Sequence, residues 1–84
     1  MTTKTSLNDT WTEVADIGQE FAITVISTTW ADIRYEESTP AADAKGHPLR
    51  QGQWLDKKLA GLKVFARSAI TGQTAVIVVS KDAV

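Results

Sequence analysis

Alternation of apolar and polar positions dominates this chain and predicts β-strands. Residues 21–27 (FAITVIS) and 74–80 (TAVIVVS) are rich in β-branched residues and apolar on both faces, so we expect two central strands covered on both sides. Residues 30–37 (WADIRYEE) and 62–70 (LKVFARSAI) alternate more regularly, which is typical of strands with one solvated face. The short links STT and TGQ predict two hairpins, and Gly72 in the second link can adopt a positive φ.

Three weaker segments complete this pattern. Residues 1–8 are polar and rich in threonine, which predicts a flexible N-terminal arm and leaves residues 9–84 as a single β domain. Residues 9–17 and 54–61 have spacings compatible with a strand or with one or two helical turns. In the first of them, the β-formers favour a strand or an irregular edge segment.

Residues 38–53 contain both prolines and two of the five glycines, which predicts a long loop with a short strand near Leu49. The pattern as a whole predicts an all-β domain: a small antiparallel sandwich or barrel built from two hairpins plus one or two weaker strands. The alternative is an α+β domain with one short helix at residues 9–17 or 54–61. In the first fold Val78 lies in a central strand, so Val78→Asp is expected to unfold the domain.

Composition narrows the classes of function. The chain has 84 residues, a net charge of −1 and no cysteine. A core this small is thin, so self-association would stabilise it. The charge balance argues against nucleic-acid binding, and no apolar run is long enough to span a membrane. Neither disulfides nor thiolate metal sites are possible. The polar start of the chain predicts a cytosolic product that no signal peptide exports.

Candidate catalytic groups are few. His47 is the one histidine, and a catalytic or metal-binding role would require partners that the sequence does not place beside it. Glu36 and Glu37 point to opposite faces of a strand, and Glu13 and Asp16 meet only if their segment is helical. Nucleotide-binding and nucleophile motifs are absent from the sequence. We therefore predict no catalytic residue, no cofactor and no metal site.

The three tryptophans are numerous for so small a chain, and tryptophan is favoured at protein interfaces and at sugar-stacking surfaces. By its alternation Trp30 falls on the polar face of its strand, so it is the first candidate for an interface or a ligand platform. Trp54 follows the long loop and is the second. Packing in the core is the alternative for each tryptophan.

The motifs of the chain follow one another in a definite order. Trp11 and Val14 come first, FAITVIS runs into WADIRYE, and PAADAKGHPL forms a proline-containing loop. Gly52 precedes a Trp-Leu pair, and VFARS and VIVVS follow toward the end of the chain. This order resembles the small virion structural proteins of tailed bacteriophages and prophages, in which a Trp-led first strand and a closing V-W/F-A-R-S … V-x-V-S hairpin frame a Pro/Gly loop. Phe65 stands here where that family often has tryptophan, and the resemblance covers residues 9–81.

This resemblance implies a capsid decoration, head-fibre or tail-associated protein without enzymatic activity. It implies a homo-oligomer of three or more subunits that binds other phage structural proteins of the capsid or tail. The protein would be made in the host cytoplasm and reside in the virion. Two other classes stay open from the residues themselves. One is a small carbohydrate-binding module that uses Trp30 or Trp54 to stack on a glycan, and the other is an enzyme subunit that depends on His47.

Overall fold

A computed structural model describes residues 2–17, 20–58 and 61–81 of the chain, with only the backbone for 56–58. Within this part every regular element is a β-strand. The strands are β1 (Thr2–Leu7), β2 (Thr12–Ala15), β3 (Glu20–Val25), β4 (Ala31–Glu36), β5 (His47–Leu49), β6 (Trp54–Lys58), β7 (Lys63–Ser68) and β8 (Ala75–Lys81). The predicted all-β class is confirmed. The two ambiguous segments contribute β2 and β6, so the α+β alternative is wrong.

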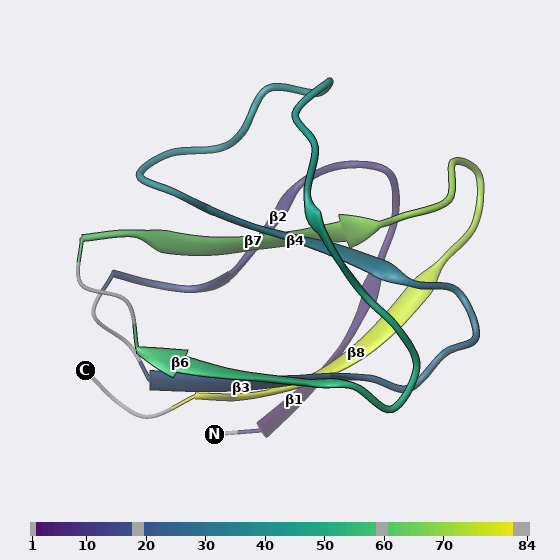
Figure 1. Ribbon diagram of the computed structural model, residues 1–84, viewed down its shortest axis with the longest axis horizontal. Helices are drawn as coiled ribbons and strands as arrows, with labels where there is room; N and C mark the ends of the chain where they lie inside the picture. The colour runs from purple at the N-terminus through teal and green to yellow at the C-terminus, as the bar shows by residue number, and fades with distance from the viewer. Residues whose placement is uncertain (1, 18–19, 59–60, 82–84) are drawn as a thin grey trace.

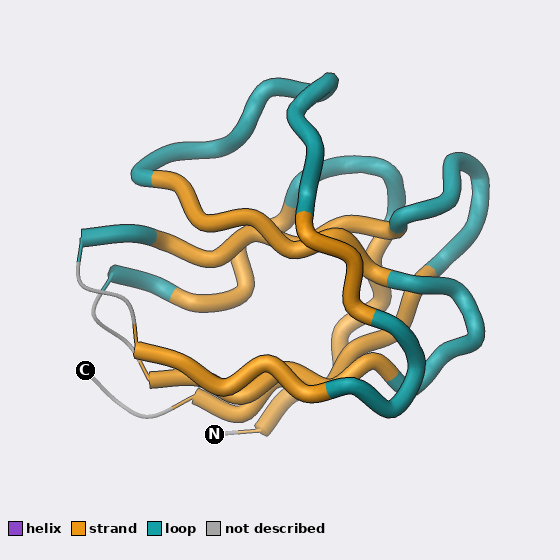
Figure 2. The backbone as a smooth tube through the Cα atoms, viewed as in Figure 1, coloured by secondary structure: helices purple, strands orange, loops and turns teal. Residues whose placement is uncertain are grey.

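The strands form two antiparallel sheets of four strands each, stacked face to face as a sandwich (Figure 1; Figure 2). Sheet A has the order β1-β8-β3-β6, and sheet B has the order β2-β7-β4-β5. The inner faces of both sheets supply one buried apolar cluster. Its members are Leu7, Val14, Ala15, Phe21, Ile23, Val25, Ala31, Ile33, Leu49, Val64, Ala66, Ala75, Ile77 and Val79.

The strands of the two predicted hairpins are right, but their pairing is wrong. β3 lies in sheet A and β4 in sheet B, whereas β7 lies in sheet B and β8 in sheet A. Among the described strands, only β4 and β5 follow each other in the chain within the same sheet. A hairpin would place the apolar faces of both strands side by side on one layer. Because the chain crosses to the opposite layer instead, the two apolar faces turn toward each other and both are buried.

The chain crosses between the sheets at the link from β3 to β4 and at the link from β7 to β8. These two links lie beside each other and are joined by hydrogen bonds. Ser27 Oγ accepts from the backbone N–H of Val76 at 2.9 Å and donates to the carbonyl of Thr29 at 2.8 Å. Thr29 Oγ1, almost completely buried, donates to Oε1 of Gln73 at 2.9 Å. Gly72 has a φ of 81°, as the TGQ pattern predicts. Small hydroxyl side chains therefore satisfy the polar groups at the corner where the chain changes sheets.

The N-terminal segment is an edge strand of sheet A and not the predicted arm. β1 pairs with β8 along its whole length, from Thr2 opposite Ser80 to Leu7 opposite Ala75, and Leu7 is buried. The other residues of β1 are polar, so this strand lacks the apolar alternation on which the prediction depended. It pairs with a strand that lies 68 to 78 positions away in the chain.

β3 and β8 are central strands, as predicted, but the sandwich covers only one face of each. Ile77 and Val79 are buried, whereas Val78 between them is half-buried on the outer face. The expectation that Val78 lies in the core is therefore wrong. Two layers use all the described strands of this short chain, and within the described residues no third layer covers the outer face of sheet A.

Candidate functional site

The three tryptophans have three different environments. Trp11 is buried, with 6% of its surface exposed. Trp30 is 39% exposed, and the guanidinium of Arg50 lies 4.2 Å from the centroid of its ring. Trp54 is 71% exposed and is the most exposed large apolar side chain in the described part of the chain. Both candidate residues, Trp30 and Trp54, reach the surface, and Trp54 is the more exposed of the two.

Trp54 belongs to the uncovered outer face of sheet A. It lies opposite Thr24 on β3, which in turn lies opposite Val78 on β8. Ala22 and Val76 are half-buried on the same two strands, and alternation places them on this outer face. We call Ala22, Thr24, Trp54, Val76 and Val78 the Trp54 face. These five side chains carry no charge and include one large ring that projects from the edge strand. Lys4 of β1 lies opposite Val78 on the same face, so the outer face of sheet A as a whole is mixed in character.

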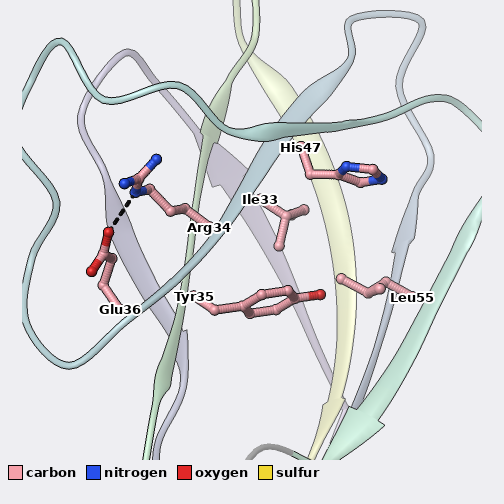
Figure 3. A pocket seen from close by; sticks show the side chains of 6 residues that line it. All are labelled: Ile33, Arg34, Tyr35, Glu36, His47 and Leu55. Atoms are coloured by element: carbon pink, nitrogen blue, oxygen red, sulfur yellow. Dashed lines mark hydrogen bonds and ion pairs between the residues drawn. The ribbon is translucent and has the colours of Figure 1, made fainter.

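A second surface feature opens at the side of the sandwich where β5 and β6 form the sheet edges. β5 pairs with β4 only between Ala31 and Ile33, whereas β4 continues to Glu36. Beyond His47, the first residue of β5, the two sheets leave a cavity of about 420 Å³. We call it the side cleft. The described residues that line it are Ile33, Arg34, Tyr35, Glu36, His47 and Leu55 (Figure 3).

The interior of the side cleft is apolar and its polar groups stand at the rim. Ile33 is buried in the core, while Tyr35 and Leu55 are partly buried hydrophobic side chains packed against it. Figure 3 shows the Tyr35 hydroxyl directed toward Leu55, with the His47 ring above both. Desolvation by burial raises the pKa of the Tyr35 phenol above its ordinary value, so the phenol is neutral at physiological pH.

The two charged residues in the described lining of the side cleft form an ion pair. Arg34 Nε donates to Glu36 Oε1 at 2.7 Å, and Arg34 Nη1 donates to the carbonyl of Lys45. Both side chains stand apart from Tyr35, His47 and Leu55 in Figure 3. The cleft therefore presents an apolar interior and an exposed imidazole to whatever enters it, without an unpaired charge from this pair. Such a cavity suits a ring-shaped apolar group.

The long loop, residues 37–46, lies over the outer face of sheet B. Arg67 on β7 donates from Nη1 to the carbonyl of Ala42 and from Nη2 to the carbonyl of Ala44, both at 2.7 Å. The same guanidinium stacks 4.3 Å from the centroid of the Trp11 ring. Trp11 and Phe65 are buried although neither belongs to the cluster between the sheets. The loop thus has a packed place in the fold, and Arg67 is its main anchor.

Gly46 allows the loop to approach the sheet closely. A Cβ atom at this position would lie 2.6 Å from Cβ of Asp32 and 2.8 Å from Cη2 of Trp11. A side chain there would force the backbone away from β4. Burial of Trp11 also leaves its Nε1 without a hydrogen-bond partner in the described structure, which costs about 1–3 kcal/mol. The cation–π contact with Arg67 offsets part of this cost.

The residues considered for catalysis do not converge. His47 is exposed at the start of β5 and lines the side cleft, with no carboxylate in hydrogen bond to it in the described structure. Glu13 pairs with Lys63 at 3.1 Å, and Glu36 pairs with Arg34. Among the side chains that the structure describes, no cluster of three or more histidine or carboxylate groups can hold a metal ion.

Sequence reasoning missed the side cleft and the anchoring role of Arg67. The cleft arises because β5 is shorter than the strand it pairs with, and strand pairing was not available from the alternation. The sequence contains one local indication of the cleft: Tyr35 and Leu55 are large apolar residues near the ends of their strands, on the faces that point inward. Arg67 is anchored to a loop more than twenty positions away, and no local pattern indicates such a contact.

No family model, curated protein or solved structure matches this chain. Within the described residues there is no helix able to cross a membrane.

Proposed function

We propose that this chain is a non-enzymatic structural subunit of a tailed-phage virion that self-associates and binds the capsid or tail. The observation that carries the self-association is Trp54, a tryptophan that is 71% exposed beside the half-buried outer residues of sheet A. Exposed apolar surface of this kind is typical of interfaces between proteins. The virion role is supported by the order of motifs described above, from Trp11 to the closing VIVVS.

Energetics favour burying Trp54 against another surface. A tryptophan buries roughly 150–250 Å² when it leaves water, and at about 25 cal/mol per Å² its exposed part corresponds to roughly 3–4 kcal/mol. Half-buried Val78 and Thr24 on the same face add to that area. A single side chain of this size is a typical hot spot in an interface, although association also has its own entropic cost.

Light scattering after gel filtration, over a range of concentrations, tests the self-association. We expect an assembly of three or more chains that dissociates on dilution, and we expect Trp54→Ala to shift the equilibrium strongly toward the monomer. Ile70→Ala is the matched control, because Ile70 is also an exposed apolar residue (42% exposed) but lies on the link between β7 and β8. A wild-type protein that is monomeric at every concentration would overturn the proposed self-association.

Immunogold labelling of phage particles produced from a genome that carries this chain tests the virion role. We expect label on the capsid or the tail in a regular arrangement. Particles that carry no label, while the chain accumulates free in the infected cell, would contradict a structural role in the virion.

Glycan binding is a second candidate, and Trp54 is the residue that favours it. An exposed indole face can stack on a sugar ring, whereas one face of the Trp30 ring is already occupied by Arg50. On a glycan array, wild type and Trp54→Phe would bind the same sugars and Trp54→Ala would not. Absence of binding to any sugar by the wild type removes this candidate.

A further inference from the structure

We propose that Trp54 of one copy of the chain occupies the side cleft of a second copy. The inference rests on the self-association proposed above and names its contact. An exposed apolar side chain and a complementary cavity elsewhere on the same protein can form a head-to-tail contact between copies. The chain has both features: an exposed indole on β6 and an apolar cavity of about 420 Å³ at the side of the sandwich.

The indole cannot fill the cleft of its own chain. Trp54 and Leu55 are consecutive residues of the edge strand β6, so their side chains point to opposite faces of sheet A. Leu55 points inward and lines the cleft, whereas Trp54 points outward. The cavity and the group that suits it therefore stand on the same edge of the molecule but face in different directions. Only another copy can bring the two together.

The lining of the side cleft matches an indole in both its apolar and its polar groups. Ile33 and Leu55 provide aliphatic surface, and the Tyr35 ring provides an aromatic neighbour (Figure 3). Aromatic pairs contribute beyond the area that they bury, and the indole N–H needs an acceptor when it leaves water. The imidazole of His47 at the rim has a ring nitrogen that can accept this hydrogen bond.

Charge at the mouth of the cleft does not oppose entry. Arg34 and Glu36 form an ion pair at 2.7 Å, so this part of the rim has no net charge. An apolar ring that approaches the cleft therefore does not have to desolvate an isolated charge from this pair, which would be costly. A cavity near the lower end of the usual range for ligand clefts, about 300–1,000 Å³, suits one large side chain better than a folded partner domain.

Two single variants separate the two halves of the contact. Trp54→Ala removes the inserted side chain and leaves the cleft intact. His47→Asp keeps Trp54 and places a carboxylate at the rim, where it is solvated in the monomer because His47 is exposed. Insertion of the indole would desolvate this carboxylate, so we expect either change to weaken assembly about 30-fold or more, measured by light scattering. Ser38→Asp, on the exposed start of the long loop, is the control for an added charge.

Mixing the two variants provides the decisive measurement. Each is expected to be monomeric alone, but the mixture retains one intact contact, between Trp54 of the His47→Asp chain and the cleft of the Trp54→Ala chain. We expect a one-to-one heterodimer. Two chains joined by one contact lose the avidity of a closed assembly, so the mixture is followed up to about a hundredfold the concentration at which the wild type assembles. Each variant alone is measured at the same total concentrations, and a heterodimer is counted only as association beyond that of either variant by itself.

The outcomes separate this inference from the proposed function. A heterodimer in the mixture supports insertion of Trp54 into the cleft. If His47→Asp assembles like the wild type while Trp54→Ala does not, or if the mixture stays monomeric, the cleft is not the receptor and self-association stands without it. A wild-type protein that never assembles overturns both. Circular dichroism melts of each variant confirm that a loss of assembly is not a loss of fold.

Discussion

Replacement of Arg67 by alanine tests whether the long loop is held against sheet B as the structure shows. The guanidinium of Arg67 joins three partners: the carbonyls of Ala42 and Ala44, each at 2.7 Å, and the ring of Trp11 at 4.3 Å from its centroid. Alanine removes all three contacts at once. The loop then has no donor from β7, and the buried ring of Trp11 has no cation above it.

The expected loss of stability follows from these contacts. Hydrogen bonds from charged donors contribute about 1.5–3 kcal/mol each, and a cation–π contact contributes about 0.5–2 kcal/mol. Arg67 is half-buried, and water replaces part of these interactions in the variant. We therefore use the lower ends and expect Arg67→Ala to lower the free energy of unfolding by about 2–4 kcal/mol. That is a large part of the roughly 5–15 kcal/mol typical of a domain.

Urea denaturation followed by circular dichroism measures this change, and hydrogen exchange locates it. The amide of Ala44 donates to the carbonyl of Ala41 within the loop, so its exchange rate reports whether the loop is in place. Faster exchange of this amide is expected in Arg67→Ala. Arg67→Lys is the matched control, because it keeps the charge but not the two-pronged donor geometry, and an intermediate loss is expected.

The outcome that would refute the argument is a change in stability within about 0.5 kcal/mol, the usual range for surface substitutions, together with unchanged exchange of the Ala44 amide. Arg67 would then be an exposed side chain without an anchoring role. The buried state of Trp11 would need another cause.

Three further predictions concern the core, the loop and the side cleft. Ile77→Ala should lower the free energy of unfolding by about 2–5 kcal/mol because Ile77 is fully buried. Val78→Ala should lower it by less than about 1 kcal/mol, because Val78 is only half-buried. Equal losses in urea denaturation would contradict the one-sided burial of β8. Gly46→Ala should cost about 1–3 kcal/mol, since its Cβ would lie 2.6 Å from Cβ of Asp32; an unchanged melt would show that the loop shifts freely. Tyr35 is the one tyrosine of the chain, so phenolate absorbance should titrate at higher pH in the folded than in the denatured protein. Because the folded state then binds more protons, stability should fall as the pH rises above about 10, the unfolded pKa, and Tyr35→Phe should remove that part of the decline.

The sequence by itself determined which segments are strands. Residues 21–27, 30–37, 62–70 and 74–80 all contain strands in the structure, and Gly72 has the positive φ that its turn predicts. Alternation is a local property of extended backbone, and it shows which residues share a face wherever one face is buried. The short strand near Leu49 was also accessible, because the apolar residue interrupts a polar loop.

Tertiary structure alone decided how these strands pair. Any two amphipathic strands can form a hairpin or face each other across a core, and the local pattern is the same in both cases. The choice depends on how the whole chain buries its apolar faces, which is why both predicted hairpins became crossings between sheets. β1 escaped prediction for a related reason: five of its six residues are polar, and its backbone is paired by a strand at the other end of the chain.

The candidate sites also differ in how much of each could be predicted from the sequence. Trp30 and Trp54 were predicted at the surface from composition and position, and exposure then ranked Trp54 first because Arg50 covers one face of the Trp30 ring. The side cleft and the anchor made by Arg67 each join residues from strands or loops that are distant in the chain. Local residue order constrains the direction in which a side chain points, whereas the contacts that it meets there depend on strand pairing and loop placement, which only the folded chain establishes.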